Sequence, residues 1–480
     1  MINLSNIKKK LVIMKFGGSC LQDGKSFKKT TKIVKKYLEE SKLIIVASAL
    51  KGITDKLIDF YQKSCEEASE CDFIIENIYN IHKHIIDEII DDNKPEYNNT
   101  LDFLEENIDE LTQLGRIVRL LRPSIDIQDI ISSYGEKLST FIVSQYFNSL
   151  ELGIKSQFIS SDEIIVTDDN FGRALPLLDE TEELVERIVN PLLKSEKIDL
   201  ICVTGFYGST KDKKITTLGR GGTDLTAAVM AYCLQPKYDC KVIYWKDVKG
   251  FLNADPRIYE KAALLKNISY IEAKELAFFG SKVLHPVCLD VNEKRNIISE
   301  IREFSNPESL EFTTITKEII EDENIIKAIT SIEKLSMVTI ESGTMVSLPG
   351  TASKLFSLLG DNNINIKFIS QSSSENNITF GIDFEDSMRV SFLLRNSDLF
   401  GKQWFSIKID NDISLIAVIG AGMLHTPGVA GKIFTTLGNN KVNVRAIAQG
   451  SSELNITFII GRDDCRKAVN VLYDAFINQK

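Results

Sequence analysis

A repeat near the carboxyl end constrains the fold of this chain more than any other feature of its sequence. Residues Pro349 to Phe380 align without a gap on Pro427 to Phe458, at an offset of 78 residues. The two segments read PGTASKLFSLLGDNNINIKFISQSSSENNITF and PGVAGKIFTTLGNNKVNVRAIAQGSSELNITF. An alignment this close predicts two copies of one small folding unit.

The first copy carries the pattern of a complete βαββαβ unit. Its segments are a strand at 335–341, a helix after Pro349, strands at 364–371 and 377–382, a helix at 387–394 and a strand at 405–409. The second copy stops soon after its last helix, 464–477, and the spare strand-like segment nearby, 325–329, precedes the first copy. We therefore expect the first unit, 333–410, to be inserted in the second, 325–332 plus 411–480, behind a linker at 311–324.

The first 310 residues show a different alternation, which predicts one α/β domain. Short apolar runs that suit buried strands lie at 11–14, 43–47, 199–203 and 241–244, with helical patterns between them. Such alternation favours a mostly parallel sheet with helices on both faces. Ile and Leu recur every three or four residues over about 56–121, which predicts a helical insert in this domain.

Length, charge and cysteine usage narrow the function classes. At about 150 residues per domain, 480 residues suggest three domains, enough for an enzyme. The 57 basic and 67 acidic side chains give a net charge of −10, which argues against nucleic acid or an anionic membrane as a partner. Without a long apolar run or a signal peptide, a cytoplasmic location is expected. The eight cysteines form no CxxC pair and the histidines have no ligand spacing, so we expect reduced thiols and no structural metal site.

A glycine turn follows the first apolar run. Lys15-Phe16-Gly17-Gly18-Ser19 places two glycines and a lysine where a strand ends and a helix begins. Backbone N–H groups can approach a phosphate there, and the lysine supplies a point charge. A glycine pair at a tight turn needs no ligand, and the P-loop pattern GxxxxGK[ST] does not occur, so packing alone explains this turn equally well.

Three further polar segments could bind charged ligands. In Thr216–Asp224, TTLGRGGTD, the Arg220 fork matches a carboxylate and Asp224 can orient cations or a metal; Thr223 or Asp224 could also cap a helix, with or without such a role. Tyr134-Gly135-Glu136 is expected to open a helix, where Glu136 could hold an ammonium group or merely favour the helix dipole. Asp247 and 253–257 follow an apolar strand, where ligands often bind, although such loops are more often plain turns.

Taken together, these segments resemble aspartokinase, and they occur in that family's order. They are KFGGS at Lys15, VASALKGITDKL at Val46, SSYGEKLS at Ser132, TGFYGS at Thr204, TTLGRGGTD at Thr216, KDVKGFLNADPR at Lys246 and ELAFFGSKVLHP at Glu275. The resemblance implies an α/β amino acid kinase fold, followed by two α+β, ferredoxin-like ACT domains. It further implies transfer of the ATP γ-phosphoryl group, with Mg²⁺ bound through ATP, to the side-chain carboxylate of L-aspartate. That reaction is the entry to lysine, threonine and methionine synthesis.

The resemblance also implies roles for individual residues. Lys15 and Asp224 would be catalytic, Lys15 at the transferred phosphate and Asp224 as the organiser of the cationic groups. Aspartate would be bound by Thr54, Glu136, Phe206, Arg220 and Thr223, with Arg220 on its α-carboxylate and Glu136 on its α-ammonium. ATP would be bound by Lys15, Gly17, Gly18, Ser19, Lys246, Asp247, Arg257 and Lys282. Lys246 stands where the family commonly has Ser or Thr, and Leu252 where it often has Tyr, so nucleotide contacts there are the least secure.

The repeats imply regulation by an amino acid. Gln371 with Asn377, and Gln449 with Asn455, suit a zwitterion with a small polar side chain, as in threonine-sensitive aspartokinases; lysine is the alternative effector. They could equally be plain turn and edge residues. Because the family's ACT units pair across subunits, a homodimer or larger assembly is expected. Two readings compete: another amino acid kinase, such as glutamate 5-kinase or acetylglutamate kinase, and a catalytically dead amino acid sensor.

Overall fold

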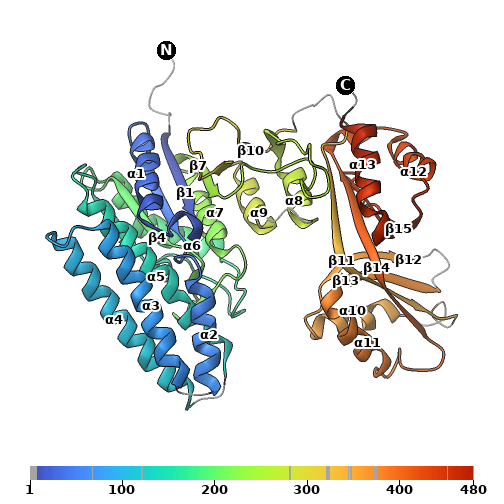
Figure 1. Cartoon of the computed structure of the whole chain (residues 1–480), viewed down its shortest axis with the longest axis horizontal. Helices are drawn as coiled ribbons and strands as arrows, with labels where there is room; N and C mark the ends of the chain where they lie inside the picture. The colour runs from blue at the N-terminus through green and yellow to red at the C-terminus, as the bar shows by residue number, and fades with distance from the viewer. Residues whose placement is uncertain are drawn as a thin grey trace. The chain divides into compact units, whose positions relative to one another are not determined.

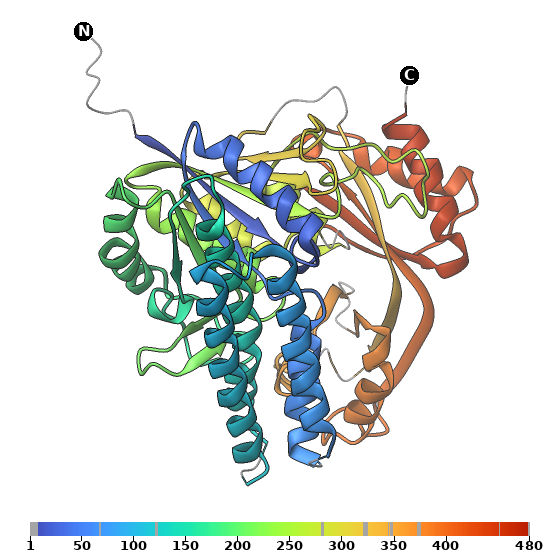
Figure 2. The same cartoon turned by 60° about the vertical axis from the view of Figure 1, so that its left-hand side comes forward.

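The computed structural model divides the chain into two compact units (Figures 1 and 2). It describes residues 8–66, 69–120, 123–279, 283–319, 325–343, 345, 349–371, 376–450 and 452–478. The first unit comprises Met1–Phe251, Lys266–Tyr270 and Lys282–Glu318, and the second Leu252–Leu265, Ile271–Ser281 and Ile319–Lys480. Two segments of the predicted first domain, 252–265 and 271–281, thus belong to the second unit.

The first unit is built on an eight-stranded sheet with the order β3-β4-β2-β1-β7-β9-β10-β8. Its strands are β1 (Lys9–Phe16), β2 (Lys42–Ala47), β3 (Ser156–Ile159), β4 (Leu200–Thr204), β7 (Tyr238–Lys246), β8 (Asn267–Ser269), β9 (Ile298–Glu303) and β10 (Thr313–Thr316). All neighbours pair in parallel except β9 and β10. The predicted mostly parallel sheet is confirmed. A small antiparallel pair, β5 (Tyr207–Ser209) with β6 (Ile215–Thr217), lies outside it.

Helices cover both faces of this sheet. Alternate strand residues point to opposite faces, so each strand contributes side chains to both helical layers. Val12, Met14 and Phe16 join a core with the long helices that follow β1 and β2. Lys15 points to the other face, where it meets α7. The helices are α1 (Gly24–Leu38), α2 (Ile53–Glu66), α3 (Ser69–Ile89), α4 (Pro95–Val118), α5 (Ile125–Ser149), α6 (Leu178–Lys194), α7 (Gly222–Leu234) and α9 (Pro286–Lys294).

The predicted helical insert folds as α2, α3 and α4, which pack against one another and against α5 (Figure 2). Each has buried apolar residues on one face, as the three- and four-residue spacing predicts. Gly115 of α4 allows a close approach, because a Cβ there would lie 2.5 Å from the Phe60 ring of α2. No helix among the described ranges is long and apolar enough to cross a membrane.

One helix start was predicted wrongly. Tyr134-Gly135-Glu136 does not open a helix but lies in the middle of α5, which begins at Ile125 after the N-cap Ser124. Gly135 is needed for close packing, since a Cβ there would lie 2.9 Å from the Cβ of Ala49, just after β2. Glu136 is therefore a buried residue of a central helix.

The second unit is built on one six-stranded antiparallel sheet with the order β12-β13-β11-β14-β16-β15. Its strands are β11 (Ala328–Glu341), β12 (Ile366–Gln371), β13 (Asn377–Asp383), β14 (Ser406–Ile419), β15 (Val444–Ala448) and β16 (Asn455–Gly461). Its helices are α8 (Tyr270–Phe278, of which Tyr270 itself belongs to the first unit), α10 (Thr351–Asp361), α11 (Ser387–Arg395), α12 (Val429–Asn439) and α13 (Cys465–Phe476).

Strand β11 serves both copies of the repeat. Its first part, 328–332, pairs with 415–419 of β14, whereas 335–341 pair with β13 as well as with the first part of β14. Register shifts near Leu335 separate the two parts. The segment that precedes the first copy, 328–332, thus contributes a strand beside the second copy, whereas 335–341 form the first strand of the first copy.

Candidate functional site

Three charged side chains meet on one face of the first sheet; Lys15 and Asp224 are buried and Lys246 is half-buried. Lys15 is the penultimate residue of β1 and Lys246 is the last residue of β7, its parallel neighbour. Asp224, in the first turn of α7, forms an ion pair with each lysine: its Oδ1 lies 3.0 Å from Lys15 Nζ and its Oδ2 lies 2.6 Å from Lys246 Nζ. Figure 1 shows β1, β7 and α7 side by side. The carboxyl ends of parallel strands are where ligands bind in α/β sheets.

Electrostatic coupling fixes the charges in this cluster. Burial pushes the pKa of Asp224 up, but the ammonium groups of Lys15 and Lys246 outweigh it, so the pKa is lowered. Burial pushes the pKa of Lys15 down, and Asp224 outweighs it, so that pKa is raised. The pKa of Lys246 is lowered, by burial and by Lys15, despite the carboxylate. Two lysines against one carboxylate leave net positive charge, which suits a phosphate group.

A glycine-rich turn precedes α7 and shapes this site. Gly219 and Gly221 have φ of 68° and 78°, a left-handed backbone that glycine adopts without strain. Gly221 is the N-cap, and no side chain caps the helix, so the predicted cap by Thr223 or Asp224 is wrong. The cap role fails because Thr223 and Asp224 lie within the first helical turn. Arg220 is exposed between the two glycines, which are themselves half-buried.

Glu136 forms a second, connected part of the site. Its side chain is buried, and Ser48 donates a hydrogen bond of 3.5 Å to its Oε1. Thr223 in turn donates to Ser48 Oγ at 3.3 Å. Burial raises the pKa of Glu136 to about 8, although Ala49 N–H and Lys15 favour its charged form. Its Oε2 has no hydrogen-bond partner among the described residues, so the carboxyl is suited to receive a ligand donor.

Phe206 has a left-handed backbone, with φ of 75°, beside the α7 turn. Its N–H donates to Thr226 Oγ1 at 3.2 Å and its carbonyl accepts from Leu218 N–H at 2.7 Å. A Cβ on Gly222 would lie 3.0 Å from the Phe206 ring. Such a conformation costs about 1–3 kcal/mol, and it is held here by these contacts on both sides.

The glycine turn after β1 brings backbone close to Lys15. A Cβ on Gly17 would lie 3.2 Å from Lys15 Nζ, and one on Gly18 would lie 2.9 Å from the carbonyl oxygen of Ala49. Side chains at either position would therefore crowd the lysine or the loop after β2. Ser19 of the same turn is exposed.

Among the described residues, Thr54 and Asp247 form no hydrogen bond or ion pair with this cluster. Thr54 is half-buried in the first turn of α2, and Asp247 is exposed directly after β7. Arg257 belongs to the second unit, where it pairs with Asp255 at 2.6 Å. Lys282 lies outside the described residues. Their roles in binding stay predictions.

Three residues at the cluster had no predicted role. Ser48 links Glu136 to Thr223, and its signal in the sequence is its place just after a buried strand. Cys288 of α9 is fully buried, and burial followed by Asp224 raises its pKa well above the usual value, so it is an uncharged neighbour. His285 packs on the α7 turn, where a Cβ on Gly221 would lie 2.8 Å from its own Cβ.

The predicted effector residues lie at the ends of strands in the second unit. Gln371 is the last residue of β12 and Gln449 directly follows β15; both are exposed. These two edge strands approach each other, because Ser370 Oγ donates to the Ile447 carbonyl at 3.3 Å. Asn377 and Asn455 begin β13 and β16, and Asn455 Nδ2 donates to Glu275 of α8. Asn455 is thus already engaged within the unit.

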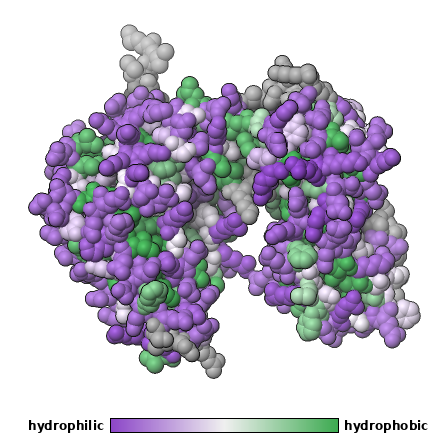
Figure 3. Space-filling model, in the orientation of Figure 1, coloured by the Kyte–Doolittle hydropathy of each residue, from purple (hydrophilic) through white to green (hydrophobic). Residues whose placement is uncertain are grey.

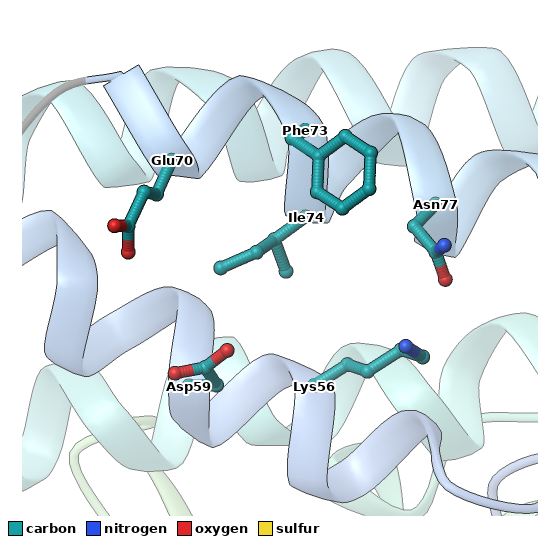
Figure 4. Close-up of a pocket in the computed structure, with 6 residues that line it drawn as sticks. All are labelled: Lys56, Asp59, Glu70, Phe73, Ile74 and Asn77. Atoms are coloured by element: carbon teal, nitrogen blue, oxygen red, sulfur yellow. The ribbon is translucent and has the colours of Figure 1, made fainter.

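A separate pocket of about 370 Å³ lies between α2 and α3 (Figure 4). It is lined by Lys56, Asp59, Glu70, Phe73, Ile74 and Asn77. No residue of the cluster lines it. Within the ranges that the structure describes, no group of three or more His, Cys, Asp or Glu side chains could hold a metal ion.

Comparison with known proteins gives consistent results. The chain is 30% identical to the bifunctional aspartokinase/homoserine dehydrogenase of Buchnera aphidicola, over 98% of this chain and 57% of that protein. The first such relatives are bifunctional, and the chain spans about half of their length. It is also 29% identical to the chloroplastic aspartokinase 1 of Arabidopsis thaliana, over 97% of this chain and 80% of that protein.

The fold matches solved structures of E. coli aspartokinase III. One holds aspartate and ADP, in the R-state, and the other lysine and aspartate, in the T-state. Each has a TM-score of 0.79, at 25% and 26% identity, and the match covers 97% of this chain and 99% of that one. An ACT domain model matches residues 338–394 and 416–476. The model of the amino acid kinase family matches residues 10–302, so the chain belongs to the amino acid kinase family.

Proposed function

We propose that this chain is an aspartate kinase, which transfers the γ-phosphoryl group of ATP to the side-chain carboxylate of L-aspartate and releases 4-phospho-L-aspartate and ADP. The observation that carries this proposal is the pairing of a cationic cluster, Lys15 and Lys246 on Asp224, with a buried carboxyl, Glu136, in one connected site. One part suits phosphate and the other suits an α-ammonium group. The reaction would be the first step toward lysine, threonine and methionine.

The chemistry requires two anions to meet. The substrate carboxylate is ionised at pH 7 and attacks phosphorus in line, so the protein needs no covalent intermediate. Lys15 and Lys246 offset the charge of the phosphates, and Arg220, exposed at the α7 turn, is free to form a bidentate pair with the α-carboxylate. Thr54, Phe206 and Thr223 would complete the aspartate pocket, and Gly17, Gly18, Ser19, Asp247, Arg257 and Lys282 the nucleotide site.

Mg²⁺ would arrive on the ATP phosphates. Each carboxylate oxygen of Asp224 already pairs with a lysine. Asp224 would therefore hold the two ammonium groups in place for the nucleotide and would not itself bind the metal. When bound, Mg²⁺ supplies further charge neutralisation on the β- and γ-phosphates. Positioning of the reactants remains the task of the protein side chains.

The test is ADP release that depends on an amino acid. Purified protein with MgATP is given L-aspartate, L-glutamate or N-acetylglutamate in parallel, and ADP is followed by a coupled assay. ADP release with aspartate, and with neither of the other two amino acids, supports the proposal. Release with glutamate or N-acetylglutamate instead would indicate a different amino acid kinase, and release with none would indicate a sensor without catalysis.

For the regulatory unit we propose threonine as the inhibitor, with lysine as the alternative. Gln371 and Gln449 are equivalent in the repeat, both are exposed at strand ends, and their strands are in contact. Amide side chains there can bind the polar groups of a small zwitterion, with the Asn377 amide at the start of the neighbouring strand. An effector must bind a less active state more tightly, because equal affinity for both states shifts nothing.

Replacing both glutamines by alanine is expected to raise the threonine concentration for half-inhibition at least about tenfold, since each amide contributes hydrogen bonds to charged groups. Turnover without threonine should stay within about twofold, because both residues lie in the second unit. Initial rates are measured against threonine and, separately, lysine. Unchanged inhibition by threonine would contradict its place at this site, and a loss of lysine inhibition alone would favour the alternative.

We further propose a homodimer or larger homo-oligomer through the first repeat copy. Met388 and Phe392 of α11, and Phe384 in the turn just before it, follow one another at four-residue steps and are 83%, 68% and 43% exposed. At the 78-residue offset the second copy has Arg462, Arg466 and Asn470, so the fold does not require apolar residues there. Figure 3 shows hydrophobic side chains in the lower part of the second unit, where Figure 1 labels α11. Exposed apolar stripes of this kind mark interfaces.

Residues of the second repeat copy, placed at the equivalent positions of α11, test this surface. The double variant Met388→Arg, Phe392→Asn is expected to weaken self-association at least about tenfold, because two large apolar side chains are lost from the contact. Sedimentation velocity over a range of concentrations gives the association constant. The control replaces Arg466 and Asn470 by alanine in α13 and should leave assembly unchanged. Equal assembly of both variants would exclude this face as the interface.

A further inference from the structure

The chain leaves the first unit directly after the strand that carries Lys246. Phe251 ends the first stretch of chain in the first unit, and the segment Leu252–Leu265 that follows belongs to the second. This segment folds back on itself as a hairpin: Leu252 bridges Leu264, and Asn253 N–H donates to the Ala263 carbonyl at 3.0 Å. We call it the 252–265 hairpin.

Asn253 is the point at which the hairpin is held by the regulatory repeats. Its side chain is buried, 6% exposed, and its Oδ1 accepts from Ala263 N–H at 2.7 Å and from the Tyr473 hydroxyl at 3.0 Å. Its carbonyl accepts from Ile329 N–H of β11 at 2.9 Å. One residue therefore joins the hairpin to helix α13 and to strand β11 of the second repeat copy.

Apolar packing surrounds these hydrogen bonds. Ala254 and Ile258 belong to the same core as α12 and α13. The rings of Tyr259 and Tyr473 stack with their centroids 3.8 Å apart. The Tyr473 hydroxyl is buried on Asn253, whereas the Tyr259 hydroxyl binds the exposed Asp474. At the 78-residue offset the first copy has Arg395 in place of Tyr473, so the helix itself does not require a tyrosine.

On the other side, the first unit holds the same chain close to the cationic cluster. Lys246 contacts Asp224, and its carbonyl accepts from Phe304 N–H at 2.8 Å. Phe251 N–H donates to Thr313 Oγ1 at 2.9 Å, and Phe251 is fully buried. Between these anchors, Asp247, Val248 and Lys249 are exposed. Asn253 follows Lys246 by seven residues, which span at most about 25 Å even when extended.

We propose that Asn253 and Tyr473 are positioning residues for the nucleotide site: their hydrogen bond fixes the hairpin, and the hairpin fixes the segment from Lys246 to Phe251 that contributes the predicted nucleotide contacts Lys246 and Asp247. This proposal rests on the proposed kinase function. It couples the second repeat copy to the cationic cluster through one hydrogen bond and the seven residues of chain from Asn253 back to Lys246, none of which beyond Lys246 and Asp247 has a predicted contact with substrate.

The variant Tyr473→Phe removes only the hydroxyl and keeps the stacked ring. The KM for ATP is expected to rise at least about fivefold, with kcat and the KM for aspartate within about twofold. The matched control, Tyr259→Phe, removes the other hydroxyl of the same stack and should leave all three constants unchanged. Thermal unfolding of the two variants should differ little from that of the parent, which separates positioning from a loss of stability.

Two further measurements keep the test independent of the assigned reaction. Hydrogen exchange at residues 246–251 is expected to speed up in Tyr473→Phe and not in Tyr259→Phe, whatever substrate the enzyme uses. The double variant Asn253→Ala, Tyr473→Phe should raise the KM for ATP no more than Asn253→Ala alone, because both act through one bond. Unchanged exchange and KM in Tyr473→Phe, or equal effects of the two tyrosine variants, would overturn the proposal. Faster exchange without aspartate kinase activity would instead retain the positioning role and refute the assigned reaction.

Discussion

Replacing Lys15 by alanine is expected to lower kcat by about 10²–10³-fold, the usual cost of removing one group that stabilises charge in the transition state. The fold should survive, because Asp224 keeps Lys246 at 2.6 Å and no buried charge is left alone. Turnover is measured as ADP release at saturating MgATP and aspartate, with thermal unfolding alongside. Lys10→Ala, an exposed lysine on the same strand, is the control and should retain full turnover.

Asp224→Ala should differ from Lys15→Ala in a way that checks the cluster. It leaves the ammonium groups of Lys15 and Lys246 buried together without a carboxylate, which costs about 3–5 kcal/mol of stability in addition to turnover. Asp224→Asn keeps an acceptor oxygen for the lysines, and its unfolding temperature should be higher than that of Asp224→Ala. A well-folded Lys15→Ala enzyme with more than a tenth of the parent kcat would contradict the assignment.

The sequence predicted four strands of the first sheet, β1, β2, β4 and β7, and thereby the position of Lys15, but not β3, β8, β9 and β10. A short apolar run that ends in lysine and two glycines can hardly be anything but a buried strand with a turn at its carboxyl end, and β1 is that strand. The meeting of Lys15 and Lys246 on one carboxylate was beyond reach, because it depends on β7 lying next to β1, from which it is more than 200 residues distant. Pattern within a segment does not encode which strands are neighbours.

Glu136 and Arg257 show two other limits. Gly135 was read as the start of a helix, whereas it serves the close approach of α5 to Ala49, and local pattern does not distinguish these uses of glycine. The resemblance assigned Arg257 to the nucleotide, in a polar loop that follows a strand. The apolar residues Ala254 and Ile258 of this loop pack in the second unit, which the sequence did not predict because that core is formed by distant segments.

Glu136→Gln is expected to raise the KM for aspartate at least about 30-fold, because a buried partner of the α-ammonium group loses its charge. The pH dependence gives the sharper result. Burial raises the pKa of Glu136 from 4.5 to about 8, so most of the empty enzyme carries a neutral carboxyl at pH 7. Aspartate must then displace a proton to bind, and its affinity in the parent enzyme should rise as the pH increases from 6 to 8.

The same shift has a consequence for stability, and its sign is set by proton binding. Between pH 4.5 and about 8 the folded chain holds a proton on Glu136 that the unfolded chain releases. The stability linked to this proton is fully present below pH 4.5 and is lost as the pH rises through 8. Glu136→Gln cannot lose a proton, so its unfolding temperature should fall less than that of the parent between pH 6 and 8.5, other groups being equal.

Both dependences are measured on the same two proteins, with Glu110→Gln as control. Glu110 is an exposed carboxylate that accepts from the Tyr134 hydroxyl beside α5, so its loss removes a charge near the helix without emptying the site. The control should keep the parent's rise in aspartate affinity with pH. If Glu136→Gln kept that rise as well, the proton would come from another group, and Glu136 would not be the acceptor of the α-ammonium.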